Sequence, residues 1–568
     1  MYRGNGTTSA VELLVDCLGI KNHDNSHDKR PVVFVGCYEH HSNLIPWRES
    51  GCEIVMVPEC DTTKDVDMQY LEKMLQLPKY QNRIKMGTFT AASNVSGKIS
   101  NVNQIAAILH KYGALAFFDY ATGAPYLPID MNPQPLSLGE YTAADIAKDA
   151  VFISPHKMIG GINTPGILVL KKHLVNQTNA PGRSGGGTVF YVTHTHHRFL
   201  SNRIERFEGG TPNVVGIMRA GLTFLVKRKI EHNYKSIMNF AGGEKTKENG
   251  NIPMSILDHD FTTYTYVVET LSRTAPNIII LGNTEKLERG RNLPIFSFVI
   301  KCGKRFLHYN YVCAILNDLF GIQSRGGCQC SGPYSQHLLG LTKFIDGKEV
   351  PNDQNDLIES ALLHYKERAE LLRPGYTRLS LPFKGLRQEE IEYVVKALEW
   401  VAKHGWSLIC QYRCNHRTGE WRHYSRQGKP LGRTERRWLS HFDFSNGTSS
   451  DTIMNGVSGE SFTQVLNKAF ENANYQLGVA RSEQKYMKQA LKMTNDSSIL
   501  EGDENLESLR WYVYPRECAQ VLMQGSSTVP ETFSPEILGA IRPLNISHQI
   551  MSSVKPPTEG KFFRFLHI

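Results

Sequence analysis

The sequence lacks several features that would place it in a special class of protein. No apolar run approaches the ~20 residues that a membrane-spanning helix needs. The first residues, 1–4, lead into Gly and Thr rather than into the apolar stretch of a secretory signal. The 11 cysteines have no disulfide-like spacing, and Cys410, Cys414 and His416 lack a second ligand pair at zinc-finger spacing. We therefore expect a cytoplasmic protein with reduced thiols, no bound metal and no membrane span.

Strong charge of either sign is also missing. The net charge of +9 is small for 568 residues, and the composition, 40% hydrophobic and 21% charged, is that of an ordinary globular protein. Much of the excess lies between Arg413 and Arg437, together with Trp421, and Trp438 follows directly. This pattern fits a solvated face, or a surface against the main domain, better than a nucleic-acid site. We expect no nucleic-acid partner.

Strands and helices alternate in the first half of the chain. Short apolar runs predict strands, and apolar residues at helical spacing predict the helices between them. This alternation favours a mostly parallel sheet covered on both faces, in which ligands collect at the carboxyl ends of the strands. The predicted strands are 31–35, 54–57, 114–118, 151–153 and 166–170, and the predicted helices are 67–77 and 102–112.

The length of the chain predicts more than one domain, because single cores stop growing at ~250–300 residues. A strand-like run and two helical patterns predict a smaller α+β domain in the middle of the chain. A basic stretch, a Ser/Gly/Asn-rich linker and two amphipathic patterns follow it. The predicted divisions are a large domain at 1–250, a small domain at 251–405 and a C-terminal extension of unknown role at 406–568.

The start of the chain combines glycines with hydroxyl side chains. Gly4 and Gly6 allow the backbone to approach a ligand closely, and Thr7 and Thr8 open a helix whose free N–H groups can bind phosphate. A glycine-rich helix start without any ligand is at least as common, so this segment alone does not decide the question.

Two charged residues follow predicted strands. Asp119 ends an apolar strand, where a carboxylate can cap a turn or pair with a protonated heterocyclic nitrogen. Lys157 follows another strand within Ser154-Pro-His156-Lys, where loss of solvent would lower the pKa of its amine toward that of a nucleophile. In isolation, Lys157 is better explained as a solvated surface charge.

The order of the motifs changes this interpretation. Between Gly4 and Trp406 they resemble the class V aminotransferase family of pyridoxal 5′-phosphate (PLP) enzymes, which includes the cysteine desulfurases. That resemblance implies PLP-dependent transferase fold type I, with a seven-stranded sheet, an amino acid substrate and a homodimer. The motifs are the Gly-Thr-Thr cradle, Glu39-His40-His41, Ser93-Asn94, Asp119, Ser154–Lys157, Phe207–Asn213 and Arg378-Leu-Ser-Leu.

The resemblance also implies roles at the ring of PLP. Lys157 matches the lysine that forms the Schiff base, and Asp119 matches the carboxylate that bonds the ring nitrogen and keeps the ring an electron sink. His40 matches the histidine that stacks on the ring, and Asn94 the asparagine that contacts the ring hydroxyl. Thr122 lies where desulfurases usually carry Gln or His, which leaves open transamination, epimerisation or β-elimination.

Further matches concern the phosphate and the substrate. Arg378 matches the arginine that holds the substrate carboxylate, a task suited to its planar fork of donors. Thr211 matches a threonine that reaches the phosphate bound by the partner subunit. The residues implied at the phosphate of the same subunit are Thr7, Thr8, Ser154 and His156.

A glycine-rich segment suggests the reaction. Arg325-Gly-Gly-Cys328-Gln-Cys330 falls where desulfurases and molybdenum-cofactor sulfurases carry Arg-x-Gly-x-x-Cys, with Cys330 in the register of the persulfide-forming cysteine. This predicts cysteine desulfuration, with a possible sulfur-acceptor protein as partner. Cys328 is a candidate to protect Cys330, to resolve its persulfide or to form a disulfide with it.

The beginning of the sequence is a departure from the family. Family members carry a substantial segment before the cradle, which contributes to the dimer and to the mouth of the active site. Its absence leaves open a truncated, non-catalytic relative that acts as a binding protein.

Overall fold

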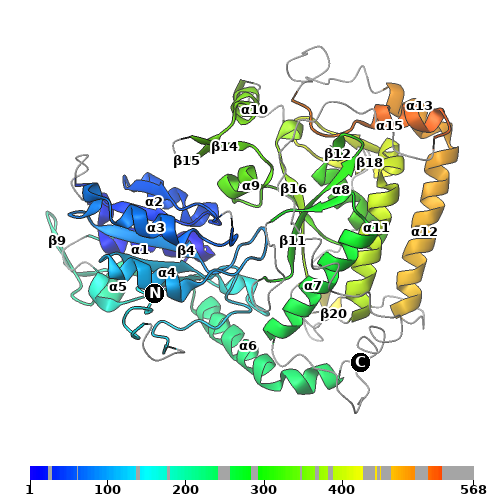
Figure 1. Cartoon of the computed structure of the whole chain (residues 1–568). Coiled ribbons are helices and arrows are strands. Elements are labelled where there is room, and N and C mark those ends of the chain that lie inside the picture. The colour runs from blue at the N-terminus through cyan, green and yellow to red at the C-terminus, as the bar shows by residue number, and fades with distance from the viewer. Residues whose placement is uncertain are drawn as a thin grey trace.

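Two lobes, each built on its own β-sheet, lie side by side in the computed structural model (Figure 1). The N-terminal lobe is drawn in blue to cyan, and the second lobe in green to orange. The structure describes residues 1–22, 29–60, 62–135, 141–175, 180–240, 256–282, 292–345, 348–364, 370–381, 388–426, 442–443, 448–449, 462–492 and 509–526.

The first lobe contains a seven-stranded sheet with five adjacent parallel strands, so the predicted mostly parallel α/β fold is confirmed. Strands β7 and β1 at one side run antiparallel to their neighbours. In spatial order the strands are β1 (Tyr2–Arg3), β7 (Gly166–Leu170), β6 (Ala150–Ile153), β5 (Leu115–Asp119), β4 (Lys85–Thr90), β2 (Val32–Val35) and β3 (Glu53–Met56).

Strand β4 was not predicted, although it is central and all six of its residues are buried. Its sequence, Lys-Met-Gly-Thr-Phe-Thr, has neither the apolar run nor the alternation that identifies a strand. Gly87 has a packing role here, because a Cβ atom at this position would lie 2.4 Å from a methyl carbon of Leu109. The helix that carries Leu109 therefore packs directly on the β4 backbone.

Helices cover both faces of this sheet, as the amphipathic spacing predicted. One face packs against α1 (Gly6–Leu18), α2 (Ile45–Glu49) and α5 (Arg203–Phe207). The opposite face packs against α3 (Met68–Leu75) and α4 (Val102–Lys111). The long helix α6 (Val214–Phe240) then leads away from the lobe along the bottom of the molecule in Figure 1.

The second lobe is α+β. Its sheet consists of β10 (Ile278–Ile280), β11 (Ile295–Cys302), β16 (Tyr376–Ser380) and β13 (Arg325–Gly327), with β12 (Arg305–Leu307) paired to β11. Its further elements are α7 (Ile256–Thr274), α8 (Tyr309–Phe320), α9 (Gly332–Leu338), β14 (Thr342–Ile345), β15 (Lys348–Pro351), α10 (Asp353–His364) and α11 (Gln388–Leu408).

The described parts of the C-terminal extension pack on this second lobe. Trp511 is 1% exposed, its indole N–H donates to the Leu372 carbonyl at 3.0 Å, and Tyr512 forms a β-bridge with Phe306. Trp421 is also buried, against His308. The elements are β17 (Tyr412–Cys414), β18 (Trp421–His423), β19 (Phe442–Asp443), β20 (Thr448–Ser449), α12 (Phe462–Ser482), α13 (Gln484–Lys492) and α15 (Pro515–Met523).

The two predicted domain boundaries can be compared with the positions of the helices. The boundary at residue 250 lies outside the described residues, between α6 and α7, and the boundary at residue 405 lies within α11. Trp438 and most of the predicted linker also lie outside the described residues.

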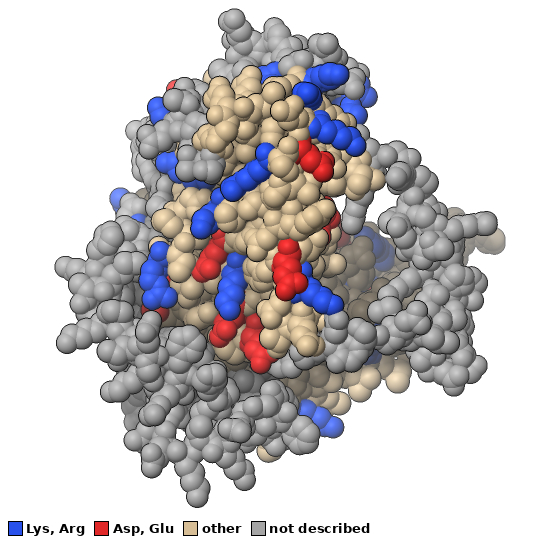
Figure 2. Space-filling model, turned by 90° about the vertical axis from the view of Figure 1, so that its right-hand side faces the viewer, with Lys and Arg blue, Asp and Glu red and all other residues tan. Residues whose placement is uncertain are grey.

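Charges of both signs are interspersed on the face that carries α12, and no patch of one sign spans the described residues visible there (Figure 2). Within the described part of the chain, none of the helices combines the length and apolarity required to cross a bilayer.

The burial of Trp511 yields a prediction about stability. We expect Trp511→Ala to lower the free energy of unfolding by about 3–5 kcal/mol, because it removes a large side chain from the core of the second lobe. Met523→Ala, in the same segment but at a side chain that is 46% exposed, should change it by less than about 1 kcal/mol. Urea unfolding followed by far-UV circular dichroism measures the free energy of unfolding of both variants. If the two substitutions lowered it equally, the packing of Trp511 described here would be wrong.

Candidate active site

Predicted site residues meet at one edge of the seven-stranded sheet. Because β2, β4, β5 and β6 are parallel, their carboxyl ends share this edge. The chain leaves these strands toward His40, Asn94, Asp119 and Lys157, respectively. Parallel topology is therefore what gathers four residues that are far apart in the sequence.

Lys157 has charged neighbours from both lobes. Its side chain keeps a solvent-accessible surface, yet the surrounding protein desolvates the amine and lowers its pKa. The carboxylate of Asp119 opposes this effect on the pKa, whereas the positive charges of Arg378 and Arg325 add to it. Lys157 thus has the lowered pKa that the sequence predicted for a nucleophilic amine.

Asp119 is buried at the end of β5. Burial raises the pKa of its carboxyl group, while the Ala121 N–H, which donates to Oδ1 at 2.7 Å, and the charge of Lys157 lower it. The Thr7 hydroxyl lies 3.5 Å from the same oxygen. A buried carboxylate with donors on one side and a lysine nearby is suited to accept a bond from a protonated ring nitrogen.

The start of α1 forms the predicted cradle. Thr7 donates its N–H to the Ser154 hydroxyl at 2.9 Å, and the two hydroxyls are also 2.9 Å apart. Gly6 has φ +62°, and a Cβ there would lie 2.5 Å from the His156 ring. Only glycine fits both the backbone conformation and the space between His156 and Ser154.

His40 is linked to the cradle through Ser42. The Thr8 and Ser42 hydroxyls are 2.5 Å apart, and the His40 Nδ1 accepts the Ser42 N–H at 3.1 Å. Burial lowers the pKa of His40 to about 4, and the charge of Lys157 contributes to the same shift. The ring is therefore neutral near pH 7, as a flat stacking partner requires.

Arg378 and Arg325 are directly opposite each other on β16 and β13. Arg378 donates to the Asn94 carbonyl at 3.0 Å, which ties the second lobe to the loop after β4. Its buried Nε has no hydrogen-bond partner among the described residues. An arginine that lies beside a second arginine and has an unpaired donor is suited to hold a carboxylate.

Cys330 belongs to the same cleft, and Cys328 does not. Cys330 contributes to the electrostatics of Lys157 and Arg378, and its sulfur lies 3.5 Å from Nη2 of Arg325. Cys328 instead acts on groups of the second-lobe interior, among them Tyr309 and Tyr376. The two thiols thus have different surroundings, which argues against a simple exchange between them.

Two of the predicted residues have weaker links to the cleft. Thr122 is half-buried in the turn after Asp119. Thr211 is exposed and lines a surface cavity of about 740 Å³ together with Gly4 and Asn5, which precede the cradle. Within one chain, therefore, Thr211 lies near the start of the cradle but is not part of it.

Sequence reasoning missed or undervalued four residues. His41 was quoted in a motif without a role, but it binds the Cys330 loop: its N–H donates to the Cys330 carbonyl at 2.7 Å. Ser42 connects His40 with Thr8, and Arg325 lies opposite Arg378. Gln329 also stands in a quoted motif, but it acts through its backbone carbonyl, which accepts from Asn94 at 2.8 Å and which residue type does not reveal.

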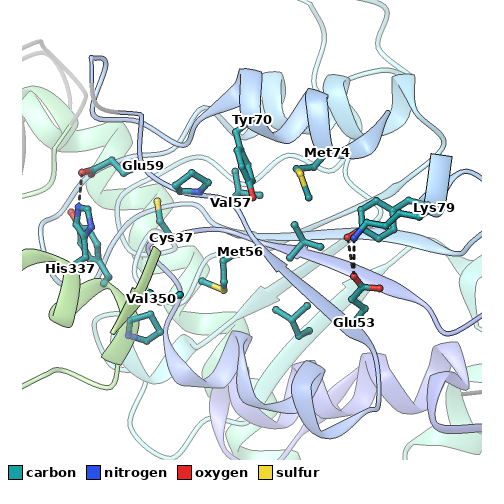
Figure 3. Close-up of a pocket in the computed structure, with 16 residues that line it drawn as sticks. Cys37, Glu53, Met56, Val57, Glu59, Tyr70, Met74, Lys79, His337 and Val350 are labelled. Atoms are coloured by element: carbon teal, nitrogen blue, oxygen red, sulfur yellow. Dashed lines mark hydrogen bonds and ion pairs between the residues drawn. The ribbon is translucent and has the colours of Figure 1, made fainter. Parts of the chain in front are cut away.

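A separate cavity of about 250 Å³ lies along the free edge of β3 (Figure 3). Tyr70 and Met74 of α3 line one side, and Val350 of β15 lines another. At one end His337 of α9 lies 3.6 Å from the Glu59 carboxylate. This contact attaches α9, the helix that follows Cys330, to the first lobe.

Comparison with known proteins gives consistent matches. The model of the family "Aminotransferase class-V" matches residues 4–238. A probable cysteine desulfurase of Chlamydia muridarum is 26% identical over 362 residues, which cover 62% of this chain and 75% of the relative. A cysteine desulfurase of Klebsiella pneumoniae is 24% identical over 334 residues, covering 58% of this chain and 68% of the relative.

A similar solved structure is that of a cysteine desulfurase from Thermococcus onnurineus NA1 in its apo form. It aligns with 70% of this chain and 78% of its own, at 20% identity and a TM-score of 0.48.

The electrostatics of the cleft yield a prediction for His40. We expect Lys157→Met to raise the pKa of His40 from about 4, because the lysine charge disfavours a protonated ring. Histidine-labelled NMR titration measures this pKa. As a matched control, Lys403→Met should raise the pKa of His404, which burial and the charges of Arg481 and Lys403 lower to about 4, and leave His40 unchanged. A His40 pKa that does not respond to Lys157→Met would place the lysine outside the cleft.

Proposed function

Because residues 4–238 of this chain belong to the class V aminotransferase family, we propose that the protein is a PLP-dependent cysteine desulfurase. The observation that carries the proposal is the set of charged neighbours around Lys157: Asp119, Arg378, Arg325 and Cys330. They come from both lobes and from three separate segments of the chain.

The residues of the cleft fit PLP on grounds that do not depend on the comparisons. Gly6 leaves space beside Ser154 and His156 that a Cβ atom would fill, at the positive end of the α1 dipole, which suits a phosphate. Asp119 is placed to bind a ring nitrogen, and His40 is a neutral flat ring. When bound, PLP supplies an electron sink for the substrate.

The chain's own groups have distinct tasks in this proposal. The Lys157 amine, whose pKa is lowered by desolvation, attaches the cofactor and afterwards exchanges protons with the substrate carbon. Asn94 lies beside Arg378, and the Arg378 guanidinium binds the substrate carboxylate. These contacts orient the amino acid with its side chain toward the Cys330 loop.

The sulfur atom passes to Cys330. Overall, L-cysteine and the Cys330 thiol give alanine and a Cys330 persulfide: the carbon–sulfur bond of the substrate breaks, a sulfur–sulfur bond forms, and the thiol proton ends on the new methyl group. Nη2 of Arg325 lies 3.5 Å from the Cys330 sulfur and helps to orient it. A sulfur-acceptor protein or a reductant then removes the persulfide sulfur.

Two substitutions test the assignment. We expect purified protein with PLP to show the visible absorbance of the lysine-bound cofactor, and borohydride reduction to fix the cofactor on Lys157. Lys157→Ala should abolish turnover, because both attachment and proton transfer are lost. Cys330→Ala should keep the absorbance band but reduce sulfide release from L-cysteine by at least about 100-fold.

The outcome distinguishes the alternatives. If Cys330→Ala released sulfide at the rate of the unchanged protein, the cysteine mechanism would be wrong, and amino-group transfer, epimerisation or β-elimination would remain. These alternative reactions are considered because Thr122 stands where desulfurases usually carry Gln or His. Absence of any PLP band would leave only a binding role.

We also propose that the chain acts as a homodimer through α6. Four apolar side chains, spaced three or four residues apart, form one exposed face of this helix; the least exposed of them retains 54% of its surface. Thr211 and its cavity lie just before α6, which would place Thr211 near a partner's cradle. The four side chains are Val215, Met218, Leu222 and Leu225.

A charge on this face tests the dimer. We expect Met218→Glu to convert the dimer to monomers, because burial of an unpaired carboxylate costs several kcal/mol. Leu363→Glu, at a side chain that is 71% exposed on α10, is the control and should leave the mass unchanged. Light scattering measures the mass, and a Met218→Glu protein that stays dimeric would move the interface elsewhere.

A further inference from the structure

The segment from Cys328 to Gly332 belongs to the second lobe but is bonded to the first. His41 makes two of these bonds: its N–H donates to the Cys330 carbonyl at 2.7 Å, and its ring Nε2 accepts the Gly332 N–H at 2.9 Å. Between these points, the Ser331 hydroxyl donates to the Glu39 carbonyl at 3.0 Å. We call this segment, residues 328–332, the cysteine loop.

The backbone of the cysteine loop is in an unfavourable conformation. Gln329 and Cys330 both have φ +57°, in the left-handed region that residues with a Cβ rarely adopt. Two consecutive residues of this kind persist only where neighbouring groups over-determine the conformation. The bonds from His41 lie on either side of Ser331 and so act on the strained part of the loop.

We propose that His41 is a positioning residue that holds the cysteine loop, and with it the Cys330 thiol, at the cleft around Lys157. The inference deepens the proposed function and rests on it for what the thiol does there. A ring fits at this place because Gly332 has no side chain: a Cβ atom at Gly332 would lie 3.0 Å from His41 Nε2. His41 does not itself touch the reacting atoms, and it acts through the loop.

The helix after the loop has its own attachments. The Tyr334 hydroxyl donates to Ser96 at 3.2 Å, and His337 lies 3.6 Å from Glu59 beside the cavity along β3 (Figure 3). Removal of the His41 ring deletes the bond to Gly332 but leaves the backbone bond to Cys330, the Ser331–Glu39 bond and the Asn94–Gln329 bond. We therefore expect the cysteine loop to loosen while α9 stays on the first lobe. This expected local effect distinguishes a positioning role from a general loss of stability.

The first measurement needs neither cofactor nor substrate. Hydrogen exchange followed by mass spectrometry on the apo protein compares His41→Leu with His41→Gln. We expect exchange in peptides that cover 328–332 to become about tenfold faster in His41→Leu, because the Gly332 N–H loses its acceptor. His41→Gln, whose amide oxygen can accept the same N–H, should restore exchange to within about threefold.

A second measurement uses the PLP-loaded enzyme with L-cysteine. For His41→Leu, kcat of persulfide formation should fall about tenfold with KM within about twofold, because the carboxylate contact of Arg378 is untouched. The matched control is His110→Leu. The His110 ring also makes two hydrogen bonds, one with the Asp145 carbonyl and one with the Asp149 carboxylate, but it lies away from Lys157. This variant should leave exchange at 328–332 unchanged.

Specific results would overturn the inference. Exchange of the cysteine loop that stays unchanged in His41→Leu would show that other bonds hold it. Equal acceleration in the Leu and Gln variants, with equal loss of melting temperature, would show that the ring only fills space. A loop released in His41→Leu of a protein that forms no persulfide would instead support the positioning role and overturn the proposed function.

Discussion

Desolvated positive charge at the carboxyl edge of the seven-stranded sheet is the constraint on which the site depends. Lys157, Arg378 and Arg325 act on one another where the lobes meet, and Asp119 is the buried carboxylate that opposes them at Lys157. Such a cluster is costly unless anions share it, because charges in a low-dielectric site repel strongly. The phosphate and the substrate carboxylate of the proposed function are anions of this kind.

The two lobes are joined by polar contacts at this site rather than by packing alone. Arg378 bonds the Asn94 carbonyl, Asn94 bonds the Gln329 carbonyl, and His41 bonds the Cys330 carbonyl. Each contact connects a first-lobe loop to a residue of the second lobe. The left-handed residues of the cysteine loop cost about 1–3 kcal/mol each. The bonds to the first lobe help to offset this cost, so the position of the thiol depends on contacts between the lobes.

Sequence reasoning found the parts of the site that depend on residue type and order. Lys157, Asp119 and His40 follow strands whose apolar runs are evident, and parallel strands bring their ends together. It failed for β4, whose Lys, Gly and Thr residues are buried for reasons of packing. It also failed for Gln329 and for the bonds of His41, because they depend on contacts between lobes and on backbone dihedral angles. The burial of Trp511 was missed for the same reason, because the sequence of the C-terminal extension does not reveal which part of the second lobe it contacts.

The separation of Cys328 from Cys330 follows from the same backbone conformation. In an extended Cys-x-Cys segment, side chains two residues apart would share one face. The left-handed Gln329 and Cys330 break that alternation, and Cys328 acts on Tyr309 and Tyr376 while Cys330 acts on Lys157. In the proposed reaction, this conformation would keep a persulfide on Cys330 in surroundings different from those of Cys328.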